Sequence, residues 1–269
     1  MSDPVIPVDL LHAAIARDAA APLVTFYDDA TGERVELSAK TFGNWVAKTA
    51  NLLVDGLGAQ PGDEVTLALP PHWQTAVWLF ACWSAGLVAV PAEPGGDGLA
   101  ADLVAVTEAD VPRAVEQGAG EIVGLSLHSL GGPLRDCPPG VTDYAVDVRG
   151  YGDRFVPYTP IDPGAAALRI GGNVRSVTLS GVELNSQTFS FVDNSGLTPS
   201  ARVLSAVSYT TVEGLLAGLL APIAAGGSVI IQRNLDKDAI DRRISLEHVT
   251  AVTGVPGRDV PSGSAYWPP

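Results

Sequence analysis

The sequence predicts an α/β fold in which β-α-β units form largely parallel sheets with helices on both faces. Strand-like and helix-like segments alternate along most of the 269 residues. Two long stretches without formal charge, 65–92 and 214–231, each have the pattern of a buried helix joined to a buried strand. That pattern is typical of parallel sheets covered on both faces. With 46% hydrophobic residues, the chain is large enough to bury such a core.

Hydrophobic spacing and turn residues predict the first elements of the fold. Residues 10–17 predict a short helix, and strands at 23–27 and 34–37 flank a polar turn, as in a β-hairpin. Ser38 suits the N-cap of the helix that follows, which carries apolar residues at helical spacing. The next three segments predict a strand, a helix and a parallel strand with a right-handed crossover: 65–69, 73–85 and 87–90.

The same alternation continues to the C-terminal region. Further strands are expected at 102–106, 120–127, 165–170, 174–180, 202–207, 228–231 and 249–252. Helices are expected between them at 111–117, 182–192, 211–225 and 236–244. Residues 140–164, rich in Pro, Gly, Tyr and Asp, predict a junction between two blocks. We therefore expect a first subdomain at 1–145, a second at 146–256, and a disordered tail at 257–269.

Charge and composition exclude several classes of partner. The 16 basic and 30 acidic residues give a net charge of −14, which disfavours nucleic acid and anionic lipid. The helical part of the first uncharged stretch would be only ~20 Å long, too short for the ~30 Å hydrocarbon layer of a membrane. Cys82 and Cys137 are expected to be reduced thiols, and no signal peptide is expected, so the predicted location is cytoplasmic. The four histidines lack metal-ligand spacing, so no metal site is expected.

Four segments, taken in order, resemble the N-terminal half of the adenylate-forming superfamily of AMP-dependent synthetases and ligases, especially acyl-CoA synthetases. The segments are 37–53, 57–65, 78–91 and 214–256. The resemblance implies the N-terminal subdomains of such an enzyme, in a chain that stops before the family's remaining nucleotide-binding motifs and mobile C-terminal domain. Enzymes of the family join a carboxylate to ATP, release pyrophosphate and usually pass the acyl group to a thiol.

The family holds the triphosphate in a loop that reads Thr-Ser-Gly-Thr-Thr-Gly-x-Pro-Lys-Gly and lies between two strands. Such a loop offers backbone N–H groups, hydroxyls and a cation to an anion. The corresponding stretch here is 167–176, with Arg175 at the position of the Lys. The resemblance therefore implies ATP or AMP, with Mg²⁺, at four candidate phosphate-binding residues: Gly171, Gly172, Arg175 and Ser176.

This stretch departs from the family's loop, and two interpretations of it stay open. The hydroxyl-bearing front is replaced by Ala167, Leu168, Arg169 and Ile170. Val174 stands at the Pro, and Gly181 at a later family His. Either the glycines and Arg175 still hold a phosphate, through the bidentate guanidinium, or the segment is an ordinary β-hairpin with a Gly-Gly-Asn turn and a solvated Arg175.

The segment that begins the helix at 211–225 is the second candidate site. The family often places a His or an aromatic residue there against the acyl group, and Thr211 occupies the position of the His. The resemblance therefore implies an acyl pocket near Thr211 and Gly214. His72, which follows Pro70-Pro71 near a helix start, is expected to cap that helix or to lie at the surface.

Three functions follow from these observations. The first is a degenerate homologue with a ligand-binding or interaction role and no independent ligase activity. The second is an ATP-dependent acyl-adenylating ligase that a partner protein, or a second copy through self-association, completes. The third is an acyl or acyl-CoA binding protein on the same scaffold.

Overall fold

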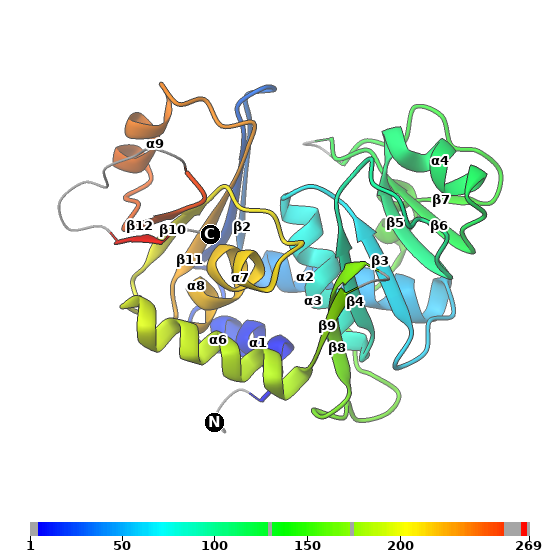
Figure 1. Ribbon diagram of the computed structural model, residues 1–269, viewed down its shortest axis with the longest axis horizontal. Coiled ribbons are helices and arrows are strands. Elements are labelled where there is room, and N and C mark those ends of the chain that lie inside the picture. The colour runs from blue at the N-terminus through cyan, green and yellow to red at the C-terminus, as the bar shows by residue number, and fades with distance from the viewer. Residues whose placement is uncertain (1–4, 129–130, 173–174, 256–264, 268–269) are drawn as a thin grey trace. The chain divides into compact units, whose positions relative to one another are not determined.

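The computed structural model describes residues 5–128, 131–172, 175–255 and 265–267 (Figure 1). The chain divides into two compact units, each assembled from separate stretches of sequence. Unit 1 comprises Met1–Phe42, Pro71–Trp73 and Asn185–Pro269. Unit 2 comprises Gly43–Pro70 and Gln74–Leu184.

Unit 1 contains a six-stranded sheet in the order β13-β12-β10-β11-β1-β2. Its strands are β1 (Pro22–Asp28), β2 (Glu33–Ser38), β10 (Arg202–Ser205), β11 (Ser228–Arg233), β12 (Ala251–Thr253) and β13 (Ala265–Trp267). All neighbours in this sheet are parallel except β1 and β2, which form the predicted hairpin. β1 pairs with β11, about two hundred residues later in the chain, so Val24 lies opposite Val229. The compact units therefore differ from the sequential division expected near residue 145, because the N-terminal hairpin joins the C-terminal strands.

Among the described residues, the helical segments that lie wholly in this unit correspond to the three helices predicted at 10–17, 211–225 and 236–244, whose starts the structure shifts to Pro7, Val212 and Ile240. They are α1 (Pro7–Arg17), α7 (Val212–Leu215), the π-helical η4 (Leu216–Leu220), α8 (Ala221–Ala224) and α9 (Ile240–Leu246). The single helix expected at 211–225 contains a π-helical turn just before Pro222. Because proline has no backbone N–H, Pro222 cannot donate to the carbonyl of Gly218, and the wider turn accommodates that loss. Ile240 and Ile244 of α9 pack against Leu204 and Ile230 on one face of the sheet.

Unit 2 contains a seven-stranded sheet in the order β7-β6-β5-β3-β4-β8-β9. Its strands are β3 (Glu64–Ala68), β4 (Val88–Ala92), β5 (Leu103–Thr107), β6 (Glu121–Leu125), β7 (Val141–Asp143), β8 (Ala166–Gly172) and β9 (Arg175–Ser180). All neighbours are parallel except β8 and β9. β7 was not predicted, because it is only three residues long within a stretch rich in turn residues. The α/β fold with largely parallel sheets is confirmed in both units.

The remaining helices complete the predicted β-α-β pattern. They are α2 (Ala39–Asn51), η1 (Leu52–Gly56), α3 (Trp73–Ala85), η2 (Glu108–Asp110), α4 (Val111–Glu116), α5 (Tyr144–Asp147), η3 (Val148–Gly150) and α6 (Gly181–Ser195). α3 coincides with the predicted helix, and every one of its residues is buried, as its lack of a polar face predicts. Ser38 caps α2 as expected, since its Oγ accepts a hydrogen bond from the backbone N–H of Thr41 at 3.1 Å.

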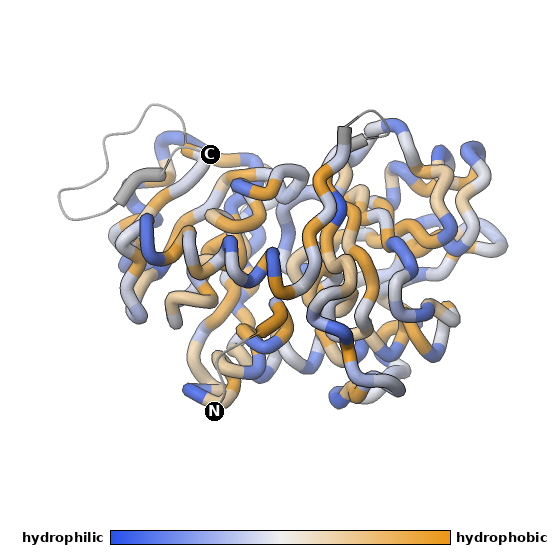
Figure 2. Tube along the Cα trace, turned by 60° about the horizontal axis from the view of Figure 1, so that its bottom comes forward, coloured by the Kyte–Doolittle hydropathy of each residue, from blue (hydrophilic) through white to orange (hydrophobic). Residues whose placement is uncertain are grey.

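Each unit contains buried hydrophobic clusters of its own, such as the one around Val104 and Val106 in unit 2 and the one around Leu204 and Ile230 in unit 1. Figure 2 shows hydrophobic residues along much of the inner trace and hydrophilic residues at many of the outer turns. Of the expected disordered tail, residues 265–267 form β13 beside β12, and 257–264 and 268–269 lie outside the described residues. Within the described part of the chain, no helix is both long and apolar enough to cross a membrane.

Candidate functional site

The candidate phosphate-binding residues lie where β8 and β9 form an antiparallel hairpin in unit 2. Gly171 pairs with Ser176, and Gly172 pairs with Arg175. Gly171 has a φ of 102°, a conformation that favours glycine. The ladder leaves a connection of only two residues, 173–174, which lie outside the described residues, as does the side chain of Arg175. The predicted hairpin is confirmed, but both interpretations of this segment place a hairpin here, so its geometry alone does not decide between them.

Packing and an ion pair hold the first half of this hairpin. The indole N–H of Trp83 in α3 donates to the carbonyl of Ala167 at 3.0 Å, and Leu168 is buried. Arg169 forms an ion pair with Glu64 of β3. Ala167, Leu168 and Arg169 thus occupy the three positions at which the family's loop reads Thr-Ser-Gly. Ala167 accepts a hydrogen bond from Trp83, Leu168 is part of the core, and Arg169 is paired with a carboxylate. Arg169, which lies beside the turn, is engaged by Glu64, so its charge is already balanced.

The end of β9 begins a helix at the position of the family's His. Ser180 caps α6: its backbone N–H and its hydroxyl both donate to the Glu183 carboxylate, at 2.9 and 2.8 Å. These hydrogen bonds lower the pKa of Glu183. Gly181 is the first residue of the helix and has no side chain to offer to a ligand. The local geometry therefore serves helix initiation.

The two candidate acyl-pocket residues lie in unit 1, at the start of α7. Thr211 is exposed, and its Oγ1 accepts a hydrogen bond from the backbone N–H of Gly214 at 3.0 Å, which makes it the N-cap. Gly214 is buried, and a Cβ there would lie 2.1 Å from the carbonyl oxygen of Ser208. Close packing explains why residue 214 is a glycine, and helix capping explains why residue 211 is a threonine. The role of these two residues in an acyl pocket therefore stays a prediction.

Two buried hydroxyls lie near these residues, and sequence patterns gave no sign of them. Ser205 Oγ and the side chain of Tyr209 both lie close to the Cα of Gly218, within 3.4 Å of where its Cβ would be. Both residues are at least 97% buried, and neither hydroxyl has a hydrogen-bond partner among the described residues. Burial raises the pKa of Tyr209, so its hydroxyl is neutral at physiological pH. Buried hydroxyls without a partner are uncommon in folded proteins, and they are the kind of group that a water or a ligand satisfies.

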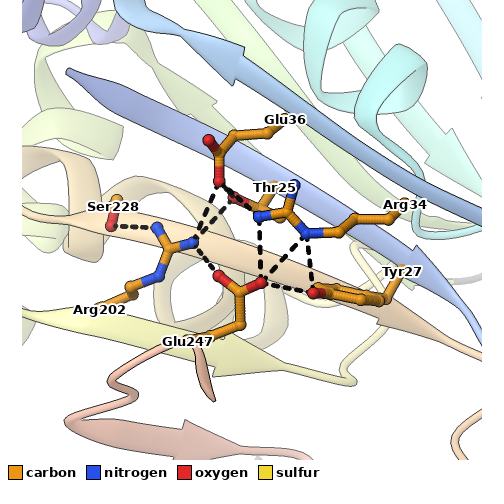
Figure 3. A network of polar contacts seen from close by, with 7 residues as sticks. All are labelled: Thr25, Tyr27, Arg34, Glu36, Arg202, Ser228 and Glu247. Atoms are coloured by element: carbon orange, nitrogen blue, oxygen red, sulfur yellow. Dashed lines mark hydrogen bonds and ion pairs between the residues drawn. The ribbon is translucent and has the colours of Figure 1, made fainter. Parts of the chain in front are cut away.

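A network of charged side chains on the unit 1 sheet is the most extensive polar cluster that sequence reasoning missed (Figure 3). Arg202 of β10 donates to Glu247 at 2.5 Å, to Thr25 at 3.2 Å and to Ser228 at 3.3 Å. Arg34 of β2 donates to the same Glu247 at 3.1 Å. The members come from four adjacent strands and from the end of α9, so no local sequence pattern could reveal them.

The network is balanced in charge and fully engaged. Two guanidiniums, of Arg34 and Arg202, face two carboxylates, of Glu36 and Glu247. Burial alone would raise the pKa of Glu247, but the hydrogen bonds that it accepts lower it to about 2. Glu247 therefore stays ionised, and each charge has an opposite partner. The arrangement suits a structural clamp that holds the β1-β2 hairpin to α9 better than it suits acid–base catalysis, which needs a pKa near the working pH.

His72 is placed differently from the expectation that it caps a helix or lies at the surface. It is completely buried, and its ring meets that of Phe26 edge-on with centroids 4.3 Å apart. Burial and, to a lesser extent, the charge of Arg233 lower the pKa of His72 to about 3, so the imidazole is neutral. Cys82 is buried and Cys137 exposed, and both are free thiols. Among the described residues, no three His, Cys, Asp or Glu side chains lie close enough to hold a metal ion.

The chain is similar to known proteins in sequence. Residues 11–110 match the family described as AMP-binding enzyme. A protein of Mycobacterium tuberculosis (strain ATCC 25618 / H37Rv), named as a TIGR03089 family protein, is 40% identical over 243 residues. The match covers 90% of this chain and 96% of that protein.

The fold is similar to that of solved acyl-CoA synthetases. ATP-bound MatB from Rhodopseudomonas palustris matches with a TM-score of 0.71 and 20% identity over 93% of this chain and 49% of its own. Acetoacetyl-CoA synthetase from Streptomyces lividans has a TM-score of 0.77 and 16% identity, over 92% of this chain and 42% of its own. An acyl-CoA synthetase from Brucella canis has a TM-score of 0.75 and 16% identity, over 91% and 47%. The chain thus spans half or less of the length of these enzymes, and the likeness concerns the fold.

Proposed function

Because the chain belongs to the TIGR03089 family and has the N-terminal fold of adenylate-forming enzymes, we propose that it is a degenerate homologue, with a ligand-binding or interaction role and no ligase activity of its own. One observation carries the proposal: the front of the segment at the position of the family's phosphate loop has lost the family's hydroxyls, and its Arg169 is already paired with Glu64. The hairpin that pairs Gly172 with Arg175 is compatible with the proposal but does not by itself decide for it.

The side chains of the hairpin support the same proposal. Positions of the family's hydroxyls hold Ala167, which accepts from Trp83, and the buried Leu168. The described front of this segment therefore offers a triphosphate with Mg²⁺ fewer hydroxyl donors than the family's loop, which supports the proposal. The two free cysteines support a cytoplasmic location as part of the proposal.

The test is ATP–pyrophosphate exchange by the purified chain with a panel of carboxylic acids. We expect no exchange above a control without enzyme, because the hydroxyl-bearing front of the family's loop is replaced by Ala167, Leu168, Arg169 and Ile170. A full-length acyl-CoA synthetase measured alongside shows that the assay works. Exchange that depends on both the chain and a particular acid would refute the proposal.

A ligase completed by a partner chain is the first alternative function. ATP-bound MatB, which shares this fold, favours nucleotide as the ligand to test, and Arg175 is the residue that would meet it. Calorimetric titration with ATP and AMP, with and without Mg²⁺, tests this alternative on wild type and Arg175→Ala. If wild type binds neither nucleotide, alone or with a candidate partner, the alternative fails.

An acyl or acyl-CoA binding protein is the second alternative, and one observation favours it. The buried hydroxyls of Ser205 and Tyr209 lie beside Gly218, close to the predicted acyl pocket, and have no partner among the described residues. Stabilisation of the chain by an acyl-CoA in a thermal-shift assay, reduced in Tyr209→Phe and not reproduced by ATP, would support this alternative. Equal stabilisation of wild type and Tyr209→Phe would remove the structural argument for it.

A further inference from the structure

A pocket opens in unit 1 at the amino ends of three parallel strands. It lies where β1, β10 and β11 begin, beside the C-terminal end of α1 and the Gly226-Gly227 turn that follows α8. α1 packs against α8. Thr211, of the candidate acyl pocket, comes after β10 and so lies toward the carboxyl ends of these strands. The pocket is therefore separate from the candidate acyl pocket.

The pocket combines an apolar floor with a charged rim. Four of the residues that line it are apolar and buried: Ala14, Leu23, Ala39 and Ala201. Arg17 and Asp18 line it from exposed positions. Its volume is about 180 Å³. Because an apolar cavity of about 150 Å³ holds a benzene molecule, this volume suits a ligand of about six to nine non-hydrogen atoms.

The two charged groups of the pocket do not pair with each other. Among the described residues, the guanidinium of Arg17 has neither an ion-pair nor a hydrogen-bond partner. Its Nη1 lies directly against Gly226, 2.1 Å from where a Cβ on that residue would be. The carboxylate of Asp18 accepts from the backbone N–H groups of Ala20 and Ala21 through Oδ1, at 2.9 and 3.2 Å. Its Oδ2 has no partner in the described part of the chain, so both charges can meet a ligand.

The ends of two helices decide which kind of ligand suits this pair of charges. α1 ends at Arg17, and the helical run that finishes with α8 ends at Ala224, so both helices direct their carbonyl ends toward the pocket. That potential and the net charge of −14 disfavour a simple anion. A simple cation is repelled by the Arg17 guanidinium. A ligand that carries an ammonium and a carboxylate satisfies both groups and is neutral overall, so the acidity of the chain does not oppose it.

We propose that this pocket binds a small zwitterion, namely an α-amino acid with a short aliphatic side chain. The ligand's carboxylate accepts from Arg17, whose planar guanidinium suits bidentate pairing with a carboxylate. The ammonium donates to Oδ2 of Asp18, and the aliphatic side chain lies on the apolar floor. The inference goes beyond the proposed function, because it concerns a different site and involves no nucleotide.

The test is calorimetric titration of the purified full chain with glycine, L-alanine, L-valine and L-leucine. We expect saturable binding, strongest for the members whose side chains fill the pocket. Two probes share the carbon skeleton of L-valine but carry one charge each: isovalerate lacks the ammonium, and isobutylamine lacks the carboxylate. Each probe is expected to bind about tenfold more weakly than L-valine, because it loses one charge-assisted contact.

Three variants assign the binding to the pocket. Arg17→Gln is expected to weaken the binding of the amino acid about tenfold. Arg242→Gln is the matched control, because Arg242 of α9 is also exposed, has no partner among the described residues and does not line the pocket. Asp18→Asn keeps an oxygen that can accept from Ala20 and Ala21 but removes the charge that meets the ammonium, so it should also weaken binding. Should Arg17→Gln fail to fold by circular dichroism, Asp18→Asn and the two probes still decide the matter.

Three results would overturn the inference. They are no saturable binding of any of the four amino acids, binding of isovalerate or isobutylamine as tight as that of L-valine, and equal weakening by Arg17→Gln and Arg242→Gln. None of them bears on the proposed lack of ligase activity, which pyrophosphate exchange measures separately. Conversely, exchange activity in a chain that binds the amino acid through Arg17 would refute the proposed function and leave this site standing.

Discussion

Replacing Glu247 by glutamine should destabilise unit 1 by about 2 kcal/mol at neutral pH. The carboxylate is 11% exposed and accepts hydrogen bonds from Tyr27, Arg34 and Arg202. Lowering its pKa from the ordinary 4.5 to about 2 corresponds to about 3 kcal/mol at 1.36 kcal/mol per pKa unit. Solvent screening at the partly exposed Arg34 reduces this to about 2 kcal/mol.

The assay is urea unfolding of wild type and Glu247→Gln between pH 7 and pH 2. Since the folded-state pKa lies below the unfolded one, the stabilisation is complete above about pH 4.5 and is lost as the pH falls toward 2. The difference between the two proteins should therefore shrink over that window. Glu116→Gln, an exposed change on α4, serves as the control and should have no effect. A loss below about 0.5 kcal/mol at pH 7, within the range of ordinary surface substitutions, would refute the reasoning.

Three further predictions concern single side chains. Burial and, less strongly, the neighbouring Asp28 raise the pKa of Glu33 to about 7, so the stability of the wild type should fall as the pH rises from about 4.5 through 7. In thermal melts, Glu33→Gln should therefore have the same melting temperature as wild type at pH 4 and a higher one at pH 8. Melting temperatures that differ by the same amount at both pH values would contradict this. In urea unfolding, Gly214→Ala should lower the free energy of unfolding by about 2 kcal/mol or more, because the added Cβ would clash with the carbonyl oxygen of Ser208. Gly150→Ala is the control and should lower it by less than about 1 kcal/mol, because open space surrounds Gly150. Tyr144→Phe should lower the free energy of unfolding by about 1 kcal/mol, because the hydroxyl of Tyr144 lies 2.7 Å from Thr49 Oγ1. Tyr209→Phe should leave the free energy of unfolding unchanged or raise it, because the hydroxyl of Tyr209 has no partner among the described residues. An equal loss in both variants would show that the Tyr209 hydroxyl is hydrogen-bonded.

The local elements were predictable because each has a signal within a few residues. The helix α3 lies between Pro70-Pro71 and Gly86, and its bounds agree with the prediction. The β1-β2 hairpin follows from an apolar run and a segment of alternating polar and apolar residues around a polar turn containing Gly32, whose φ is 73°. The π-helical turn before Pro222 was not predicted, because the apolar spacing of 211–225 fits an uninterrupted helix equally well.

Long-range pairing was beyond the reach of sequence patterns. Nothing near Val24 indicates that Val229 will lie opposite it, and the two compact units follow from that pairing. The clamp around Glu247 was missed for the same reason, since its members are brought together only by the order of strands in the sheet. The candidate phosphate loop was located through a resemblance. The loss of the family's hydroxyls and a hairpin with a Gly-Gly-Asn turn were both visible in the sequence, whereas the ion pair of Arg169 with Glu64 was not.

The discontinuous make-up of the two units has a consequence for how the chain folds during synthesis. All of unit 2 has emerged once Leu184 has left the ribosome, so its sheet can form while the rest of the chain is still being made. The first 42 residues belong to unit 1 and have no parallel strand to join until β11, at Ser228–Arg233, has been made. During that interval the apolar strand β1 has only its hairpin partner β2. Its docking is therefore expected to be a late, slow step, because the contacts that it awaits are distant in sequence.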